Sequence, residues 1–311
     1  MGTKGVVGSF LVGVAGDSGS GKSTFARGIV RLFGTVQVAT ISLDDYHLLD
    51  RQQRKQQDIV ALDPRANDLK KLAQHAEMLK QGKTIPKPRY NHSTGKIDPP
   101  VSFKPKRVVI LEGLLPFHTK KLRELMDFFI YIDPDFEVKK IWKIKRDVEE
   151  RGHSRQAVLA SIAERSPHYE RFIAPQRRYA EIIVNIKGER SEERYRRGSP
   201  YWVRLVQKLT EEGLSDIHLP LDLSAMCQSE GEELYFEYRK GMRGKSKVSK
   251  IEINGLIARE ALSEVEARIA EIAGRPQAHV LPRSKRYVTE IDIAQLIIAW
   301  RVVERIAAKE S

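Results

Sequence analysis

The first stretch that could do chemistry is residues 16–23, which read Gly16-Asp17-Ser18-Gly19-Ser20-Gly21-Lys22-Ser23. The spacing G-x-x-x-x-G-K-S is typical of a phosphate-binding loop, because glycines have no Cβ to keep backbone N–H groups from closing around β- and γ-phosphates. Lys22 adds a positive charge, and the hydroxyl of Ser23 is suited to Mg²⁺. An apolar run precedes the loop and a helical pattern beginning at Thr24 follows it. Residues 16–24 therefore predict a nucleoside triphosphate site. An ordinary Gly/Ser turn is the other interpretation, and the apolar run before the loop and the helical pattern after it argue against that interpretation.

Two carboxylates follow the next predicted strand, which runs from Val36 to Leu43 and is rich in β-branched residues. Asp44 and Asp45 come directly after it, and in open α/β sheets ligands lie beyond the carboxyl ends of the strands. A carboxylate at this place can accept the proton of a hydroxyl and aim that hydroxyl at a γ-phosphate. An Asx turn or a helix cap is the other interpretation of an aspartate here. The spacing alone leaves both interpretations, and the choice between the two residues, open.

A further carboxylate, Glu112, lies at the end of the apolar run 107–113. In a P-loop protein this pattern is expected of the strand beside the first one, with the carboxylate near the metal and its water shell. A glutamate can also end an apolar strand by chance. Because the phosphate-binding loop is present, we favour a magnesium site to which Ser23 and Glu112 contribute.

Cations concentrate towards the end of a predicted helix over residues 135–151, which Gly152 would terminate. Arg146 and Arg151 could belong to a lid that neutralises charge on a phosphoryl group during its transfer. Alternatively, Asp147 and Arg151 form an ordinary i, i+4 ion pair on the surface. The pattern does not choose between the two.

The elements that position these residues follow from apolar periodicity and from capping and breaking residues. Buried strands are expected at Phe10–Ala15, 36–43, 107–113, Phe128–Ile132 and 181–186. Helices are expected from the phosphate loop to Phe33, where Gly34 ends the helix, from an Asn67 or Asp68 cap to Gln81, and from a Ser154 cap to Ser166, where Pro167 breaks the helix. This alternation predicts an α/β fold of the three-layer P-loop NTPase type, with a mostly parallel central sheet.

Two polar segments interrupt the alternation. Residues 51–66 are basic and are predicted to form a loop or lid segment. Residues 85–95 carry two prolines, two cations, Tyr90 and His92, a composition that suits a loop gripping a substrate. A solvated hairpin is the other interpretation of residues 85–95.

The character of the chain changes near residue 188. Residues 189–311 show strand-like patterns at Asp216–Leu223, 233–239 and 247–253 and helical patterns at 258–272 and 291–309. We expect a kinase domain over 1–188, with a lid around 143–178, and an appended α+β subdomain over 189–311 that extends the sheet or makes a dimer contact.

Charge and composition limit the partners. The chain has 54 Lys plus Arg against 41 Asp plus Glu, an excess of 13, but the cations alternate with acids along helices and no nucleic-acid-binding motif accompanies them. We interpret the excess as attraction for anionic small molecules, not for nucleic acid or a membrane. The single cysteine, Cys227, cannot form an internal disulfide, in agreement with a reducing, cytoplasmic location.

Taken in order, the motifs closely resemble phosphoribulokinase in its plant and cyanobacterial form and its archaeal relatives, over about residues 8–187. The matching stretches are Gly16-Asp17-Ser18-Gly19-Ser20-Gly21-Lys22-Ser23-Thr24, 43–51 (Leu-Asp-Asp-Tyr-His-Leu-Leu-Asp-Arg), 90–95 (Tyr-Asn-His-Ser-Thr-Gly), 111–114 (Leu-Glu-Gly-Leu), 142–147 (Trp-Lys-Ile-Lys-Arg-Asp), 150–154 (Glu-Arg-Gly-His-Ser) and Pro175-Gln176. Uridine kinase shares the phosphate loop and an acidic strand end but lacks the 90–95 and 150–154 pieces.

The resemblance implies a kinase that uses ATP and Mg²⁺ to phosphorylate the 1-hydroxyl of D-ribulose 5-phosphate, giving D-ribulose 1,5-bisphosphate, and that forms a homodimer. It implies Asp44 as the catalytic base, with Lys22, Arg146 and Asp147 also in the catalytic machinery. The sugar phosphate would be bound by His47, Arg51, Tyr90, His92, Lys143, Arg151 and Arg165. ATP would be bound by residues 16–24, and Mg²⁺ by Ser23 and Glu112.

The chain also departs from that family. Its plant and cyanobacterial members carry a regulatory cysteine inside the phosphate loop and another just before the Leu-Asp-Asp-Tyr-His stretch, where this chain has Ser20 and Ser42. Disulfide switching through that pair is therefore impossible here, and we expect constitutive or metabolite-controlled activity. Two alternatives remain: a nucleoside kinase similar to uridine kinase, and a basic P-loop ATPase that acts on nucleic acid.

Overall fold

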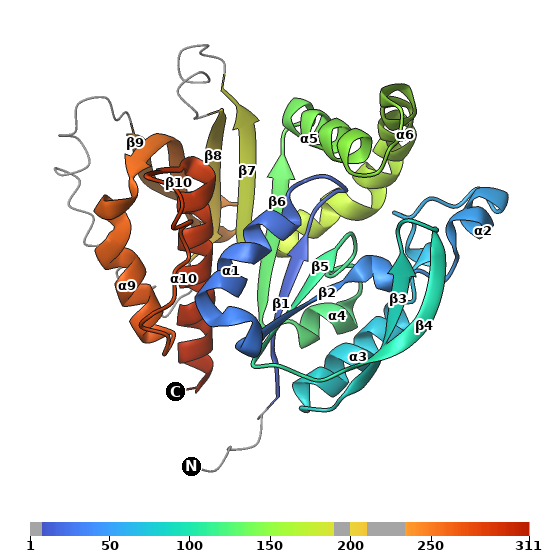
Figure 1. Ribbon diagram of the computed structural model, residues 1–311, viewed down its shortest axis with the longest axis horizontal. Coiled ribbons are helices and arrows are strands. Elements are labelled where there is room, and N and C mark those ends of the chain that lie inside the picture. The colour runs from blue at the N-terminus through green and yellow to red at the C-terminus, as the bar shows by residue number, and fades with distance from the viewer. Residues whose placement is uncertain (1–7, 190–199, 210–233, 311) are drawn as a thin grey trace. The chain divides into compact units, whose positions relative to one another are not determined.

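The computed structural model describes residues 8–189, 200–209 and 234–310 (Figure 1). By their contacts these residues form two compact units. The first contains the described part of 1–22 together with 36–132 and 139–180, and the second contains 23–35, 133–138 and the described part of 181–311. A domain boundary after residue 188 stays a prediction.

The first unit is built on four parallel strands in the order β2, β5, β1, β6. They are β1 (Phe10–Ala15), β2 (Val38–Ser42), β5 (Val108–Gly113) and β6 (Phe128–Pro134). The apolar runs of β1 and β5 are almost wholly buried, as expected of parallel strands covered on both faces. The register aligns Glu112 with both Val14 and Ser42, so the ends of β1, β2 and β5 lie at one edge of the sheet.

Two helices cover one face of these strands. α3 (Leu69–Lys80) begins at Asp68, whose side chain accepts from the Lys71 backbone at 2.9 Å, and α4 (Lys120–Leu125) begins at Thr119, which caps it in the same way. Leucines and alanines of α3 and α4 pack against Leu11, Ile41 and Val109 of the strands. The predicted helix from an Asp68 cap is confirmed.

The two polar segments fold more than the sequence indicated. Residues 51–66 were predicted as a loop or lid segment. They contain α2 (Arg51–Gln56) and a 3₁₀ turn at Pro64–Ala66, so the first part of the segment is helical and not a loop. Asp50 and Gln53 form a reciprocal capping box that starts α2, although this helix has no buried face. Residues 85–103 form an antiparallel hairpin of β3 (Ile85–Asn91) and β4 (Lys96–Phe103), which confirms the hairpin interpretation.

The lid region consists of α5 (Phe136–Glu149) and α6 (Arg155–His168), separated by Gly152 at φ 69° and capped by Ser154 as predicted. The expected break at Pro167 is wrong, because α6 continues to His168 and then widens into a π-helical turn over Tyr169–Ile173. A proline near a helix C-terminus removes one hydrogen bond, and the wider turn re-pairs the backbone beyond it.

The second unit combines helices with antiparallel strands. α1 (Lys22–Gln37) is interrupted at Gly34, at φ 76° and ψ 159°, where the helix was predicted to end. The strands are β7 (Ile182–Gly188), β8 (Tyr201–Lys208), β9 (Leu234–Arg243), β10 (Ser246–Ala258) and β11 (Tyr287–Thr289), and the later helices are α9 (Ser263–Ile272) and α10 (Glu290–Glu310). β8 pairs with β7 and β10, and β10 also pairs with β9 and β11. The strand predicted at 216–223 and Cys227 lie outside the described residues.

α10 is buried along most of its length, and α1 reaches it through Gly28, where a Cβ would lie 3.0 Å from the Cβ of Gln295. Arg31 of α1 donates to the Val280 carbonyl at 2.9 Å. The described residues therefore confirm an α/β fold with a mostly parallel central sheet and a C-terminal α+β region. No helix in this part of the chain is both long and apolar enough to span a bilayer.

Candidate active site

The phosphate loop turns directly out of β1, with Gly19 at φ 79° and Gly21 at φ 88°, in the backbone region that favours glycine. The Lys22 ammonium donates to the carbonyls of Gly16 at 3.0 Å and Asp17 at 2.7 Å. An ammonium has three donors, so one remains to be directed at a phosphate. Burial lowers the pKa of Lys22, opposed by the nearby carboxylates of Asp44 and Glu112.

The glycines of the loop also let α5 approach. A Cβ on Gly19 would lie 2.9 Å from the Cβ of Lys143, and one on Gly21 would lie 3.0 Å from the ring of Trp142. The motif therefore serves two purposes, curvature around phosphate and contact with the helix that carries the lid cations.

We expect Gly19→Ala to destabilise the protein more than Gly152→Ala. Both residues have positive φ, which costs an alanine roughly 1 to 2 kcal/mol, but a Cβ on Gly152 would have nothing within 4 Å. The clash with Lys143 adds about 1 to 3 kcal/mol at Gly19. Denaturant unfolding of the two variants measures the difference, and equal losses would show that α5 does not pack against the loop as described.

Asp44 and Asp45 lie in a 3₁₀ turn, Leu43–Tyr46, which the hydroxyl of Ser42 caps by accepting from the Asp44 N–H at 3.3 Å. Asp45 is held by the Lys87 ammonium and by the Tyr90 N–H at 2.9 Å, so it ties the turn to β3. Asp44 instead faces two imidazoles, His47 Nε2 at 3.9 Å and His92 Nε2 at 3.4 Å. The structure thus separates the two carboxylates: Asp45 anchors the hairpin and Asp44 faces the side chains expected to bind the substrate.

Asp44 remains ionised at neutral pH. Burial raises its pKa, but His47, His92, Lys22 and Arg165 outweigh burial and hold the pKa below its usual value. The ring of Tyr90 lies between the two histidines, edge-on to His47 at 5.0 Å and to His92 at 5.1 Å between ring centroids. Two imidazoles, with the Tyr90 ring packed edge-on against both, therefore lie beside a carboxylate that can accept a proton.

Burial lowers the pKa of His47 to about 4, from an ordinary value of 6.5. Between pH 6.5 and about pH 4, His47 is protonated in the unfolded chain and neutral in the folded chain. Its contribution therefore lowers the free energy of unfolding as the pH falls through this range. We expect the wild type to lose roughly 2 kcal/mol more than His47→Gln between about pH 7 and about pH 5. Unfolding curves at the two pH values test this, and parallel losses would contradict a buried, neutral His47.

The hairpin turn is tied to α2 by Arg51. Its guanidinium donates to the His92 carbonyl at 2.6 Å, and its backbone N–H donates to Gly95 at 2.8 Å. Arg54, also in α2, donates to the Tyr90 hydroxyl at 2.9 Å. Arg51, Tyr90 and His92 are therefore brought together beside Asp44.

Asp147 is the centre of the lid cations. It pairs with Lys143 at 2.6 Å, with Arg146 at 2.8 Å and with Arg151 at 3.4 Å. Burial raises the pKa of Asp147, but Lys143 and Arg146 outweigh burial and lower it. Arg146 also donates to the Ser18 hydroxyl at 3.1 Å, which brings one lid arginine onto the phosphate loop. The predicted i, i+4 ion pair between Asp147 and Arg151 is present, and it is one part of this larger cluster.

A second ion cluster holds the start of the loop. The Asp17 carboxylate lies 3.0 Å from the Lys139 ammonium and 3.8 Å from the Arg165 guanidinium. Burial raises the pKa of Asp17, and these two cations more than compensate. Ser20 is fully buried, and its hydroxyl has no hydrogen-bond partner among the residues that the structure describes. Ser23 and Thr24 belong to the second unit, where the Thr24 hydroxyl accepts from Arg27.

The donor set suits a magnesium ion that also binds phosphate. Glu112 is partly buried at the end of β5, and its charge reaches the Lys22 ammonium. In the described part of the chain, no cluster of three or more metal-binding side chains exists. Mg²⁺ in phosphotransferases is held by one or two protein oxygens together with substrate phosphates and water, so a single carboxylate beside the phosphate loop fits this ion.

Three residues shape the site without having been predicted as site residues, although Gln176 belongs to one of the stretches that match the family. Lys139 pairs with Asp17, and the buried Gln176 fixes the segment after β5 by bonding Leu114 and Phe117. Asn67, expected only as a possible helix cap, bonds the imidazole of His47. The pattern gave no signal for Lys139 or Asn67, because their partners are distant in sequence.

A nucleotide loop after β1, a carboxylate at the end of a neighbouring strand and a cationic lid are the features of a P-loop phosphotransferase. Residues 11–191 match the Phosphoribulokinase / Uridine kinase family, and the chain belongs to this family. The family predicted from the motifs is confirmed.

Individual relatives agree. A phosphoribulokinase from Synechocystis sp. is 42% identical over 255 residues, which are 79% of this chain and 76% of that protein. A uridine kinase from Clostridium perfringens is 35% identical over 179 residues, 56% of this chain and 86% of that protein. The solved structure of phosphoribulokinase from Rhodobacter spheroides has a TM-score of 0.57 at 17% identity, over 96% of this chain and 98% of that chain, a likeness of fold.

Proposed function

We propose that this protein is an ATP-dependent kinase that phosphorylates the 1-hydroxyl of D-ribulose 5-phosphate, giving D-ribulose 1,5-bisphosphate and ADP. The observation that carries this proposal is Asp44, an ionised carboxylate beside the phosphate-loop lysine and between two neutral histidines. The similarity to the Synechocystis phosphoribulokinase over 79% of this chain supports the same acceptor.

In this proposal Asp44 accepts the proton of the acceptor hydroxyl as the hydroxyl attacks the γ-phosphorus of ATP. Lys22 and Arg146 stabilise the charge on the transferring phosphoryl group, because both reach the phosphate loop. Asp147 keeps Lys143, Arg146 and Arg151 together despite their mutual repulsion. Mg²⁺ at Glu112 and Ser23 would neutralise phosphate charge when bound.

The anionic end of the acceptor is assigned to the hairpin side of the site, where Arg51, Tyr90 and His92 gather with Lys143, Arg151 and Arg165 as further candidates. A guanidinium binds phosphate with charge-assisted and often bidentate hydrogen bonds. A nucleoside acceptor has no phosphate to match such cations, so their presence favours a sugar phosphate over uridine.

ADP release from Mg²⁺-ATP, measured with ribulose 5-phosphate, ribose 5-phosphate, uridine or no acceptor, tests the function. We expect rapid turnover only with ribulose 5-phosphate and loss of that turnover in Asp44→Asn. Faster turnover with uridine would favour the nucleoside kinase. ATP hydrolysis stimulated by RNA or DNA without an acceptor would favour an ATPase acting on nucleic acid.

We also infer a cytoplasmic homodimer. Among the described residues, β9 pairs along one edge with β10 and exposes Tyr235, Tyr238 and Met242. A ten-residue edge strand with exposed apolar side chains is a surface that proteins normally cover. Light scattering after size-exclusion chromatography should give twice the 35.5 kDa mass of the chain, and a mass of 35.5 kDa would contradict the dimer.

A further inference from the structure

The hydrogen bond between His47 and Asn67 fixes the position of a proton. His47 Nδ1 lies 2.9 Å from the Asn67 side-chain oxygen. The orientation of that amide is set by its nitrogen, which donates to two backbone carbonyls, Ala61 at 3.0 Å and Asp63 at 2.8 Å. The amide oxygen must therefore face His47, and an amide oxygen only accepts. It follows that Nδ1 carries the hydrogen and that Nε2 presents a lone pair.

Backbone hydrogen bonds also hold His47 and Asn67 side by side. His47 and Asn67 form an antiparallel β-bridge. On either side of it, the Leu48 N–H donates to Ala66 at 2.8 Å and the Asp68 N–H donates to Tyr46 at 2.7 Å. Asn67 thus connects the turn that carries Asp44 to the start of α3, and neither ring nor amide is free to turn.

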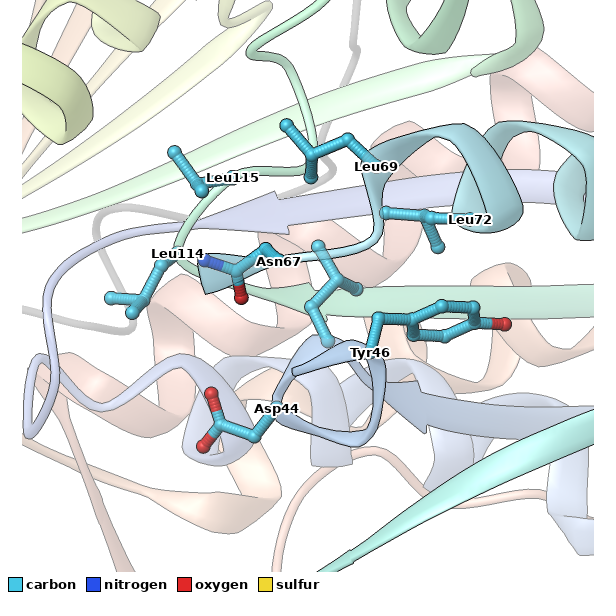
Figure 2. Close-up of a pocket in the computed structure, with 8 residues that line it drawn as sticks. Asp44, Tyr46, Asn67, Leu69, Leu72, Leu114 and Leu115 are labelled. Atoms are coloured by element: carbon cyan, nitrogen blue, oxygen red, sulfur yellow. The ribbon is translucent and has the colours of Figure 1, made fainter. Parts of the chain in front are cut away.

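The imidazole of His47 is buried, and Asn67 borders a mostly apolar pocket. Figure 2 shows Asp44 and Asn67 on the wall of a small pocket, with Leu69, Leu72, Leu114 and Leu115 around the rest of it. The side chain of His47 is 3% exposed. A hydrogen bond in such surroundings is stronger than one in water, so the amide can hold the imidazole in one tautomer.

His47 Nε2, which carries the lone pair, lies 3.9 Å from Oδ1 of the Asp44 carboxylate. Both atoms are acceptors, so a ligand between them must supply two donors. Burial holds the pKa of His47 at about 4, which keeps the ring neutral. A phosphate has no donor to offer when ionised and would be repelled by both atoms, whereas a polyol has several.

We propose that Asn67 is a positioning residue that fixes the tautomer of His47, so that Nε2 accepts a hydrogen bond from a second hydroxyl of the acceptor while Asp44 deprotonates the first. This inference rests on the proposed function. In ribulose 5-phosphate the oxygen next to the reacting hydroxyl is a carbonyl and cannot donate, so the nearest donor along the sugar chain is the 3-hydroxyl, and we assign the second hydrogen bond to it. Asp44 takes the transferred proton, and no bond is made or broken at His47. His47 therefore senses the configuration at C3.

The experiment compares kcat/KM for D-ribulose 5-phosphate and for its C3 epimer, D-xylulose 5-phosphate, in the wild type, Asn67→Ala, His47→Ala and the double variant. We expect Asn67→Ala to lower kcat/KM for the ribulose ester about 10- to 100-fold, as loss of a ring-orienting partner does elsewhere, and to narrow the preference between epimers. The KM for ATP should stay within about twofold, because the side chain of Asn67 bonds His47, Ala61 and Asp63 and, among the described residues, no residue of the nucleotide loop. The double variant should be no worse than His47→Ala, because Asn67 acts through His47.

Arg65→Ala is the matched control. Arg65 bonds Asp63 in the same turn but does not touch His47, and we expect the epimer preference to be unchanged. An Asn67→Ala enzyme that is slower but keeps the wild-type preference between the two epimers would overturn the proposal. So would a double variant in which the losses of kcat/KM from Asn67→Ala and His47→Ala add fully.

A spectroscopic measurement does not depend on turnover. ¹⁵N NMR of histidine-labelled wild type, with His47→Gln to assign the signal, should show His47 neutral and protonated at Nδ1. A signal from the other tautomer, or from an imidazolium at neutral pH, would overturn the proposal even if Asn67→Ala does not fold. If the wild type phosphorylates neither epimer but the Nδ1–H tautomer is found, the proposed function has failed while the positioning by Asn67 stands.

Discussion

Asp44→Asn is expected to lower kcat by about two to four decades, which is roughly 3 to 5 kcal/mol of barrier. An amide cannot accept the hydroxyl proton, yet it has the shape of the carboxylate, so binding of ATP should be nearly unchanged. Steady-state and single-turnover kinetics with ribulose 5-phosphate separate the effect on kcat from the effect on ATP binding. A variant within about fivefold of the wild type would remove Asp44 from the mechanism, because general base catalysis contributes far more than that.

Asp45→Asn is the matched control for this prediction. Asp45 has the same chemistry one residue away, but it binds Lys87 and the Tyr90 N–H instead of facing the histidines. Its replacement should loosen the hairpin and raise the KM for the sugar phosphate more than it lowers kcat. If Asp45→Asn showed the larger loss of kcat, the roles of the two carboxylates would be reversed.

Arg146→Ala is expected to lower kcat about 10³-fold, because an arginine that stabilises the transferring phosphoryl group acts mainly in the transition state. Arg146 is placed for this by its 3.1 Å contact with the Ser18 hydroxyl of the phosphate loop. Removing it also leaves Asp147 with two cations in place of three, so Lys143 and Arg151 retain their partner.

Arg151→Ala provides the comparison for Arg146→Ala. Both arginines pair with Asp147, but Arg151 lies two residues beyond the end of α5 and reaches that carboxylate at 3.4 Å. We expect Arg151→Ala to raise the KM for the acceptor with a smaller loss of kcat. An Arg146→Ala enzyme with normal kcat and a raised KM for ATP would show that Arg146 only binds the nucleotide.

Much of the nucleotide half of the site could be predicted from the sequence. The phosphate loop, the strand before it, the helix end at Gly34 and the cap at Asp68 are local features, since a few neighbouring residues set their backbone angles and hydrogen bonds. For the same reason, the sequence predicted that Asp44 and Asp45 follow one strand and that Glu112 ends another. The segment 51–56 was not, because α2 is a polar helix with no buried face and therefore no apolar periodicity.

The sequence by itself determined that the chain binds a nucleoside triphosphate and which family it belongs to, because both follow from short motifs with fixed spacing. Only the tertiary structure showed that Asp45 binds the hairpin while Asp44 faces two histidines, and that Arg51 bonds the turn of the hairpin formed by residues 85–103. It also showed that Asp147 pairs with three cations. It alone joined Asn67 to His47, 20 residues earlier in the chain. The physical reason is that a carboxylate or an imidazole acquires its charge, tautomer and role from the atoms packed around it. Those atoms come from segments that are distant in sequence, so local residue spacing does not show that they are neighbours.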